Sequence, residues 1–323
     1  MTTTTTDKKR LRTPEHRFND LPDYPYSPHY IEVSDSQYGP LRMHYVDHAG
    51  TGNTPVVLML NGEPSWSYAY RKVIAAVADA GYRAVAPDHI GFGRSDKLPD
   101  RQDYSYQKFV DWMIDFVQQL DLHNIVLLCQ DWGGPIGLRT LAALPDRFAA
   151  VIAANTLLPS CEPPPNGVSP WPGQLIEDWV AATRAADDLP VADIVNGVCV
   201  SPLSPSIKAA YDAPFPDASY KAAALEFPSL IPTAADMPGC QENRRAWQVL
   251  DNWHKPFVTA FSDQDPSTGA WQAVFQQRIP GADHHHHTEI TGAGHFVQEE
   301  QPQQLAQVVI GLLQQLSPPA TGR

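Results

Sequence analysis

The stretch LLCQDWGGPIG, residues 127–137, places a carboxylate where a nucleophile could stand. An apolar, strand-like run ends at Asp131, and Trp132 and two glycines follow it. Glycine two positions after the apex permits a sharp strand-to-helix turn, which lifts the apex side chain above the end of the strand. Such turns more often present a serine. An aspartate that only caps a helix is the plain alternative, but suitable partners farther along the chain favour a nucleophile.

An aspartate at this apex predicts a different reaction from the one that serine performs. A serine that attacked a saturated carbon would form an ether, which a histidine and water cannot hydrolyse. A carboxylate that attacks the same carbon forms an ester, and water can attack that ester at the carbonyl carbon of the aspartate. The alcohol then leaves and the carboxylate is regenerated. Asp131 therefore predicts a two-step substitution at an sp³ carbon.

A carboxylate and a histidine downstream can complete a catalytic triad with Asp131. The run FVTAFSDQDPSTG carries Asp263 and Asp265, and we favour Asp265 as the acid from its place in the loop just before Pro266. TGAGHFVQEE places His295 in a glycine-rich loop, where a merely solvated side chain is the alternative. The order nucleophile, acid, histidine is that of the α/β-hydrolases. We expect Asp265 to orient His295, and His295 to deprotonate the attacking water.

The stretch NGEPSWSY, residues 61–68, could supply part of an oxyanion hole. It follows an apolar run, and its glycine allows the next backbone N–H to face the elbow. We therefore expect the backbone N–H groups of Glu63 and Trp132 to stabilise the oxyanion of the second step. A plain strand-to-helix turn is the alternative.

Two indole N–H groups could bind the leaving group. Trp132 adjoins the nucleophile, and Trp179 lies on the expected helix QLIEDWVAATR, where core packing is the alternative and Trp171 a weaker competitor. An indole N–H only donates, so two of them suit an anion such as a halide. An epoxide oxygen would instead need a proton, and Tyr211 and Tyr220 are the candidate donors.

Composition and charge exclude several classes of partner. The chain has 323 residues, of which 43% are hydrophobic, and a formal net charge of −13, which argues against nucleic acid and anionic membranes. No run approaches the roughly 18 apolar residues of a membrane helix, and the N-terminal stretch does not resemble a signal peptide. We expect a cytoplasmic protein with a small, largely uncharged substrate. The sequence carries no coiled-coil signal, so we expect a monomer.

The cysteines and the consecutive histidines offer a second set of reactive groups. Cysteines stand at positions 129, 161, 199 and 240, widely spaced and without a C-x-x-C pair, so we expect reduced thiols and neither disulfides nor a zinc site. The run His284–His287 is internal. Its alternate members could share a metal, but we expect an exposed loop that leads into a strand. We predict no metal and no cofactor.

Strand-like and helical patterns alternate along the chain, and these elements must position the reactive groups. The strand-like runs are HYIEVSD, LRMHYVDH, TPVVLMLNG, the start of YRAVAPDHIGFGRSD, NIVLLCQ, FAAVIAANT, KPFVTAFSD and HTEITGAGHF. Alternation with helices predicts a mostly parallel sheet flanked by helices, the α/β class. Residues 157–237 break the pattern and are rich in proline and alanine, so we predict an inserted, mainly helical cap. The core would then comprise residues 1–156 and 238–323.

The motifs resemble those of the haloalkane dehalogenases, in particular the subgroup with two halide-binding tryptophans. The motifs that carry the resemblance are GEPSWSYAYRK, APDHIGFGRSDK, QDWGG, AYDAPFPDASYKA and GHFVQE, and it extends from LRTPEHRF to the last helix. It implies an α/β-hydrolase fold with an inserted cap and a reaction that needs no cofactor, in which a haloalkane and water give an alcohol and a halide. The implied roles are nucleophile for Asp131, acid for Asp265, base for His295, halide donors for Trp132 and Trp179, and oxyanion N–H for Glu63.

Some positions depart from the family's pattern. The family usually has histidine at the position of Asn61 and a branched aliphatic residue at that of Cys129. Other dehalogenases place the acid after the strand that follows the elbow helix, where this chain has the uncharged Asn155, which agrees with Asp265. An epoxide hydrolase with the same triad and a catalytically silent binding module are the alternative functions.

Overall fold

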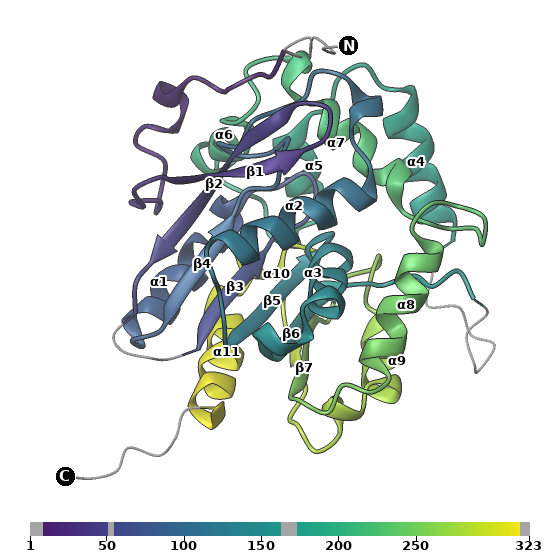
Figure 1. Ribbon diagram of the computed structural model, residues 1–323. Coiled ribbons are helices and arrows are strands. Elements are labelled where there is room, and N and C mark those ends of the chain that lie inside the picture. Colours follow the sequence, from purple (N-terminus) through teal and green to yellow (C-terminus); the bar gives the residue numbers. More distant parts are fainter. Residues whose placement is uncertain (1–8, 51–54, 163–172, 317–323) are drawn as a thin grey trace.

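An eight-stranded, mostly parallel sheet forms the centre of the molecule in the computed structural model, which describes residues 9–50, 55–162 and 173–316 (Figure 1). The strand order is β1-β2-β4-β3-β5-β6-β7-β8. β1 and β2 form an antiparallel hairpin, β2 pairs antiparallel with β4, and the remaining pairs are parallel. The strands are β1 (His29–Asp35), β2 (Gly39–His48), β3 (Val56–Leu60), β4 (Arg83–Pro87), β5 (Ile125–Asp131), β6 (Phe148–Thr156), β7 (Phe257–Ser262) and β8 (Thr288–Ile290).

Helices cover both faces of the sheet, which confirms the predicted α/β-hydrolase architecture. The helices are α1 (Arg71–Asp79), α2 (Tyr106–Gln119), α3 (Gly133–Ala143), α4 (Gln174–Ala185), α5 (Val191–Gly197), α6 (Pro205–Asp212), α7 (Ala222–Glu226), α8 (Cys240–Leu250), α9 (Trp271–Arg278), α10 (Val297–Glu300) and α11 (Pro302–Leu316). One hydrophobic core contains side chains of α2, α3, α8 and α9, and the other contains those of α1, α10 and α11. Figure 1 shows α2 and α3 in front of the sheet and α10 behind it.

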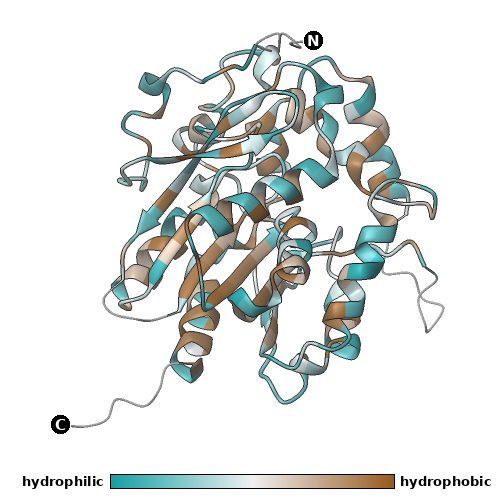
Figure 2. Cartoon of the chain, in the orientation of Figure 1, coloured by the Kyte–Doolittle hydropathy of each residue, from teal (hydrophilic) through white to brown (hydrophobic). Residues whose placement is uncertain are grey.

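Burial explains why the central strands carry continuous apolar runs. Every residue of β3 and β7 is buried, and so is every residue of β5 up to Gln130. Parallel strands covered on both faces are apolar throughout rather than alternating. In Figure 2 hydrophobic residues accordingly dominate these strands, while the helices carry a hydrophilic side.

An inserted helical region interrupts the sheet pattern between β6 and β7, as predicted. Its described part, residues 157–162 and 173–237, contains α4 to α7 and two short 3₁₀ helices, η5 (Ala218–Tyr220) and η6 (Phe227–Leu230), with no strand among those residues. Phe227 of η6 packs against Trp132, which begins the turn after β5. The insertion therefore contacts the carboxyl end of β5 directly. Its exact limits at 157 and 237 stay a prediction.

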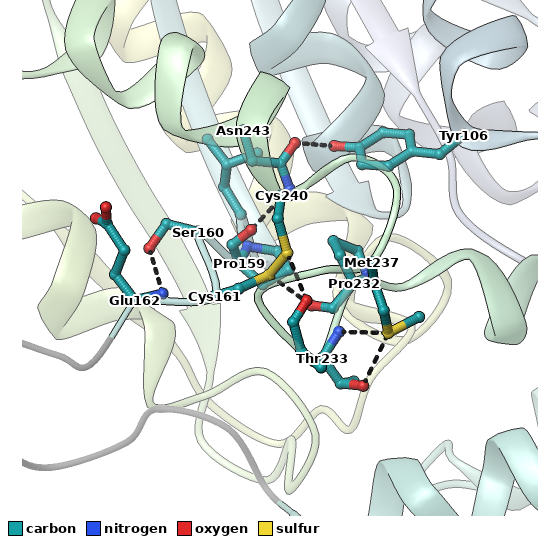
Figure 3. Close-up of a disulfide and its surroundings, with 12 residues drawn as sticks. Tyr106, Pro159, Ser160, Cys161, Glu162, Pro232, Thr233, Met237, Cys240 and Asn243 are labelled. Atoms are coloured by element: carbon teal, nitrogen blue, oxygen red, sulfur yellow. Dashed lines mark hydrogen bonds between the residues drawn. A yellow bond between two sulfur atoms is a disulfide. The ribbon is translucent and has the colours of Figure 1, made fainter.

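The prediction that all four cysteines are reduced is wrong for two of them. Cys161 and Cys240, which are 79 positions apart in the chain, form a disulfide with their Cα atoms 5.8 Å apart (Figure 3). Cys129 and Cys199 are free thiols. Cys161 follows β6 at the start of the insertion, and Cys240 begins α8 at its end. The prediction failed because wide spacing in sequence does not separate these cysteines in space. The segments that lead into and out of the insertion, its two stems, lie side by side in the fold.

Hydrogen bonds join the same two stems beside the disulfide. Asn243 of α8 donates to the carbonyl of Pro159 at 2.7 Å and accepts from the Tyr106 hydroxyl at 2.8 Å. The indole N–H of Trp247 donates to the carbonyl of Leu158 at 2.8 Å. The region around the disulfide is therefore also held by contacts that do not depend on it.

Candidate active site

The turn after β5 lifts Asp131 out of the sheet. Asp131 has a backbone φ of +50°, and the β5–β6 register shifts between Gln130 and Asp131. The hydroxyl of Thr156 donates to the Asp131 carbonyl at 2.6 Å. A side chain at Gly133 would collide with the backbone of the neighbouring strand β3, so a glycine is required where α3 begins. A non-glycine residue with positive φ is strained, and such residues concentrate at functional sites.

The structure brings Asp131, His295 and Asp265 together. Nε2 of His295 lies 3.3 Å from Oδ2 of Asp131, and its Nδ1 lies 3.2 Å from Oδ2 of Asp265. The Asp265 carboxylate also accepts hydrogen bonds from the backbone N–H and hydroxyl of both Ser267 and Thr268. Asp263, the competing carboxylate, instead accepts from the backbone N–H of Gly292 at 2.9 Å. The imidazole therefore bridges two carboxylates, and Asp263 is not one of them.

The charges of these three groups reinforce one another. Burial raises the pKa of the Asp265 carboxyl, but His295 and the hydroxyl donors outweigh it, so the net pKa lies well below the usual range. Burial lowers the pKa of His295, whereas the carboxylates of Asp265 and Asp131 raise it to about 10. At neutral pH the resting site therefore holds an imidazolium between two carboxylates.

The loop after β3 directs a backbone donor at the same carboxylate. The N–H of Glu63 donates to Oδ1 of Asp131 at 2.9 Å. Asn61 shapes this loop, because its side-chain amide donates to the carbonyls of Gly62 and Ser65 at 3.2 and 3.0 Å. The Glu63 side chain is buried, and burial followed by the charge of Asp131 raises its pKa well above the usual range. The loop thus presents to the site a buried carboxyl with a raised pKa and a backbone N–H donor.

Both indoles proposed for halide binding have free N–H groups. Among the described residues, neither Trp132 nor Trp179 donates a side-chain hydrogen bond. The Trp132 ring is buried against Tyr106 and Phe227, with ring centroids 5.2 and 4.9 Å away. Trp179 is partly buried against the same core, on a helix, α4, that contacts η6 and hence the element of Phe227. Trp171 lies outside the described residues.

The tyrosines required by an epoxide hydrolase do not form a pair over Asp131. The Tyr211 hydroxyl is fully buried and donates to Oε2 of Glu299 at 2.7 Å, within a cluster that includes Arg71. Tyr220 is partly buried against the other core, the one that contains Trp132. Each of these two tyrosines therefore lies in a different core, which leaves the site without the expected pair.

Sequence reasoning missed two residues that touch the imidazole. The side-chain amide of Gln130 lies 3.1 Å from Nε2 of His295, and the Ser267 hydroxyl lies 3.0 Å from its Nδ1. Gln130 was detectable, because it is a polar residue inside an otherwise apolar buried run. Ser267 carries no such signal, since a serine after a proline is ordinary loop sequence.

The inserted region also holds the loop that carries His295. The backbone N–H of His295 donates to the carbonyl of Val198 at 2.9 Å. The Glu300 carboxylate accepts from the N–H groups of Gly294 and Ser201 at 2.7 and 2.8 Å. Asn155, at the alternative acid position, donates to the His295 carbonyl at 3.0 Å. The position of the imidazole therefore depends on the core and the insertion together.

The consecutive histidines form a surface loop before β8. His285 and His286 line a pocket against α11, and the His287 ring bonds to the N–H of Thr259 and the carbonyl of Ala282. Within the described residues, histidine, cysteine and acidic side chains form no group of three or more that could hold a metal ion. In the same part of the chain, no helix has the length and apolarity needed to cross a membrane.

Comparisons with known proteins agree on one family. Residues 55–302 match the family model described as the alpha/beta hydrolase fold. A haloalkane dehalogenase of Psychrobacter cryohalolentis is 46% identical over 302 residues, covering 94% of this chain and 97% of the relative. One of Mycolicibacterium paratuberculosis is 42% identical over 308 residues, covering 95% and 99%. The structure of a tetrameric haloalkane dehalogenase from Paraglaciecola agarilytica matches with a TM-score of 0.84 and 36% identity, covering 97% and 99% of the two chains.

Proposed function

This chain belongs to the haloalkane dehalogenases, hydrolases that act on carbon–halide bonds, and we propose that it works through a covalent ester of Asp131. One observation carries the proposal. The Asp131 carboxylate stands at the apex of the elbow with Oδ1 2.9 Å from the Glu63 N–H and Oδ2 3.3 Å from Nε2 of His295. A carboxylate between an oxyanion donor and a base is arranged to form an ester and then to be released from it.

In the first step, Oδ2 of Asp131 attacks the carbon that carries the halogen. The new C–O bond forms as the carbon–halogen bond breaks, and the halide leaves with the bonding electron pair. Oδ1 is bound by the Glu63 N–H and becomes the carbonyl oxygen of the ester. The free indole N–H groups of Trp132 and Trp179 would receive the halide, because each can donate to an anion and neither can take its charge away.

Formation of the ester prepares the base for the second step. The negative charge of Asp131 is one reason why the pKa of His295 is raised to about 10. The ester has no such charge, so the pKa of His295 falls and the imidazolium releases its proton to solvent. Neutral His295 then takes a proton from water while the hydroxide attacks the ester carbonyl. Asp265 stays ionised and stabilises the imidazolium that forms.

The tetrahedral intermediate then collapses to products. Its negative oxygen is the former Oδ1, held by the N–H groups of Glu63 and, in this proposal, Trp132. The alkoxide leaves with the proton that His295 carries, which gives the alcohol and leaves Asp131 as a carboxylic acid. The carboxyl then gives its proton to Nε2 of His295, 3.3 Å from Oδ2 in the resting site, and this restores the carboxylate and the imidazolium. The balance is one haloalkane and one water consumed, with one alcohol, one halide and one proton formed.

Trapping the ester tests the proposal. Replacing His295 with glutamine should leave the first step intact and abolish the second, so incubation with a short bromoalkane should release one bromide per active site. Whole-protein mass spectrometry should then show one added alkyl group, localised to the peptide with Asp131. The Asp131→Asn variant is the matched control and should gain no mass. Multiple turnovers by His295→Gln, or alkylation of Asp131→Asn at another residue, would contradict the proposed roles.

The proposed substrate is a small halogenated aliphatic compound, with water as the second reactant and no cofactor. We also propose that the chain is a cytoplasmic monomer with neither nucleic acid nor membrane as partner, as its composition suggests. The Paraglaciecola agarilytica relative is described as tetrameric, so size-exclusion chromatography with light scattering is the direct test. A mass near 35.6 kDa would support the monomer, and four times that value would contradict it.

A further inference from the structure

Gln130 is the buried residue directly before the nucleophile, and its side chain contacts the catalytic histidine at two points. Its Nε2 donates to the His295 carbonyl at 3.1 Å and lies 3.1 Å from the ring Nε2. Its Oε1 accepts from the amide of Gln298 at 3.1 Å. Gln130 is fully buried, so water does not compete for these bonds.

The neighbours of Gln130 determine which way its amide faces. A backbone carbonyl oxygen only accepts hydrogen bonds, so the NH₂ group of Gln130 must face His295. The second N–H of that group then points at the ring Nε2, which can accept a hydrogen bond only when it carries no proton. Nδ1 faces Asp265 and Ser267 and is therefore the nitrogen that keeps its proton.

We propose that Gln130 is a positioning residue for hydrolysis of the ester, which holds His295 in the neutral tautomer whose Nε2 takes a proton from water. This inference rests on the ester mechanism proposed above. The hydrogen bond from Gln130 to the His295 carbonyl holds the backbone of His295 in place. The second N–H of the Gln130 amide stabilises the unprotonated ring after the charge of Asp131 is lost and before water binds. In the first step the ring is an imidazolium, whose protonated Nε2 cannot accept a hydrogen bond, so Gln130 makes no bond to the ring in that step.

Three ionisable groups face the imidazole, from the loop after β3, the last residue of β5 and the loop after β7. Asp131 loses its charge in the ester, and burial raises the pKa of the Glu63 carboxyl, which favours its neutral form. Asp265 alone keeps its charge during hydrolysis. The fall of the hydrolysis rate at acidic pH, its acid limb, therefore reports the pKa of His295 in the ester, as set by Asp265 and Gln130. Loss of a donor to neutral Nε2 raises the pKa of His295 in the ester and moves this limb to higher pH.

The test measures the two steps separately. A stopped-flow halide burst reports ester formation, and the steady-state rate across pH reports hydrolysis when hydrolysis is slower. Gln130→Leu keeps the buried volume similar and removes the amide. We expect the acid limb to move up by about 0.7 pH unit, or about a fivefold loss of rate at a given acidic pH, the size of one hydrogen bond. The burst rate should stay within about twofold of the unmodified enzyme.

Two further variants keep the test decisive. Gln130→Glu places a charged acceptor against the imidazole, so it should shift the acid limb further and also serves if Gln130→Leu does not fold. Gln298→Leu breaks the same buried network without touching His295, and it should keep the original limb. An unshifted limb in Gln130→Leu, an equal shift in Gln298→Leu, or an equal slowing of the burst would overturn the proposal. Absence of any alkylated His295→Gln enzyme would instead overturn the ester mechanism.

Discussion

The disulfide between Cys161 and Cys240 supports a quantitative prediction about stability. The bond links positions 79 apart in the chain and closes a loop that contains all of the predicted insertion except its first few residues. For a loop of this length, the loss of chain entropy in the unfolded state corresponds to about 4.5 kcal/mol at 25 °C. Residual structure in the unfolded chain lowers the effect. We therefore expect the double variant Cys161→Ser, Cys240→Ser to lose about 3 kcal/mol of unfolding free energy.

Catalysis should respond much less than stability to the loss of this bond. Asn243 and Trp247 still join α8 to the segment after β6 through buried hydrogen bonds of 2.7 and 2.8 Å. The folded arrangement of the two stems therefore does not depend on the disulfide, and the change falls mainly on the unfolded state. Halide release at 25 °C should stay within about twofold of the unmodified enzyme.

The assay is urea unfolding followed by tryptophan fluorescence, with and without a reductant. A thiol titration of the unfolded, unreduced protein should first find two free thiols, and four after reduction. Reductant should destabilise the unmodified enzyme and leave the double variant unchanged. Cys199→Ser is the matched control, because Cys199 lies in the inserted region as a free thiol, so this variant should respond to reductant like the unmodified enzyme. Unfolding energies within about 0.5 kcal/mol for the oxidised enzyme and the double variant would refute the reasoning.

Three other variants test the remaining roles. Asp265→Asn leaves Nδ1 of His295 without a charged partner, so turnover should fall by about 10³–10⁴-fold in steady-state halide release while the protein still folds. Trp179→Phe should weaken the saturable quenching of tryptophan fluorescence by bromide, and an unchanged binding curve would remove Trp179 from the halide site. Glu299→Gln leaves the buried Arg71 unpaired, so urea unfolding should show a loss of about 3–5 kcal/mol. Burial raises the pKa of Glu299, but the bonds and the charge of Arg71 outweigh burial, so the net pKa is lowered. The stabilisation is therefore complete above the usual pKa range of glutamate and disappears as pH falls through the lowered pKa. Below that pH the variant and the unmodified enzyme should have the same stability.

The reaction class was readable from the sequence because its determinants are local or follow chain order. An apolar run that ends at Asp131 before two glycines specifies the elbow, and glycine is needed there because the adjacent strand leaves no room for a side chain. Asp265 and His295 each follow a strand-like run, and the carboxyl ends of parallel strands meet at one edge of the sheet. The backbone donor at Glu63 follows from the same rule, since its loop succeeds β3, the neighbour of β5.

Only the tertiary structure decided how distant segments meet around those groups. Gln130 and His295 are 165 positions apart, and the two disulfide cysteines are separated by 79. No local pattern encodes such pairs, because packing of the sheet, the insertion and the helices sets their distance. The sequence by itself determined the α/β class and predicted Asp131 as the nucleophile and the order of the triad, since periodicity and turn chemistry act over a few residues. The contact of Gln130 with the imidazole and the disulfide across the insertion depend on which distant segments the fold brings together.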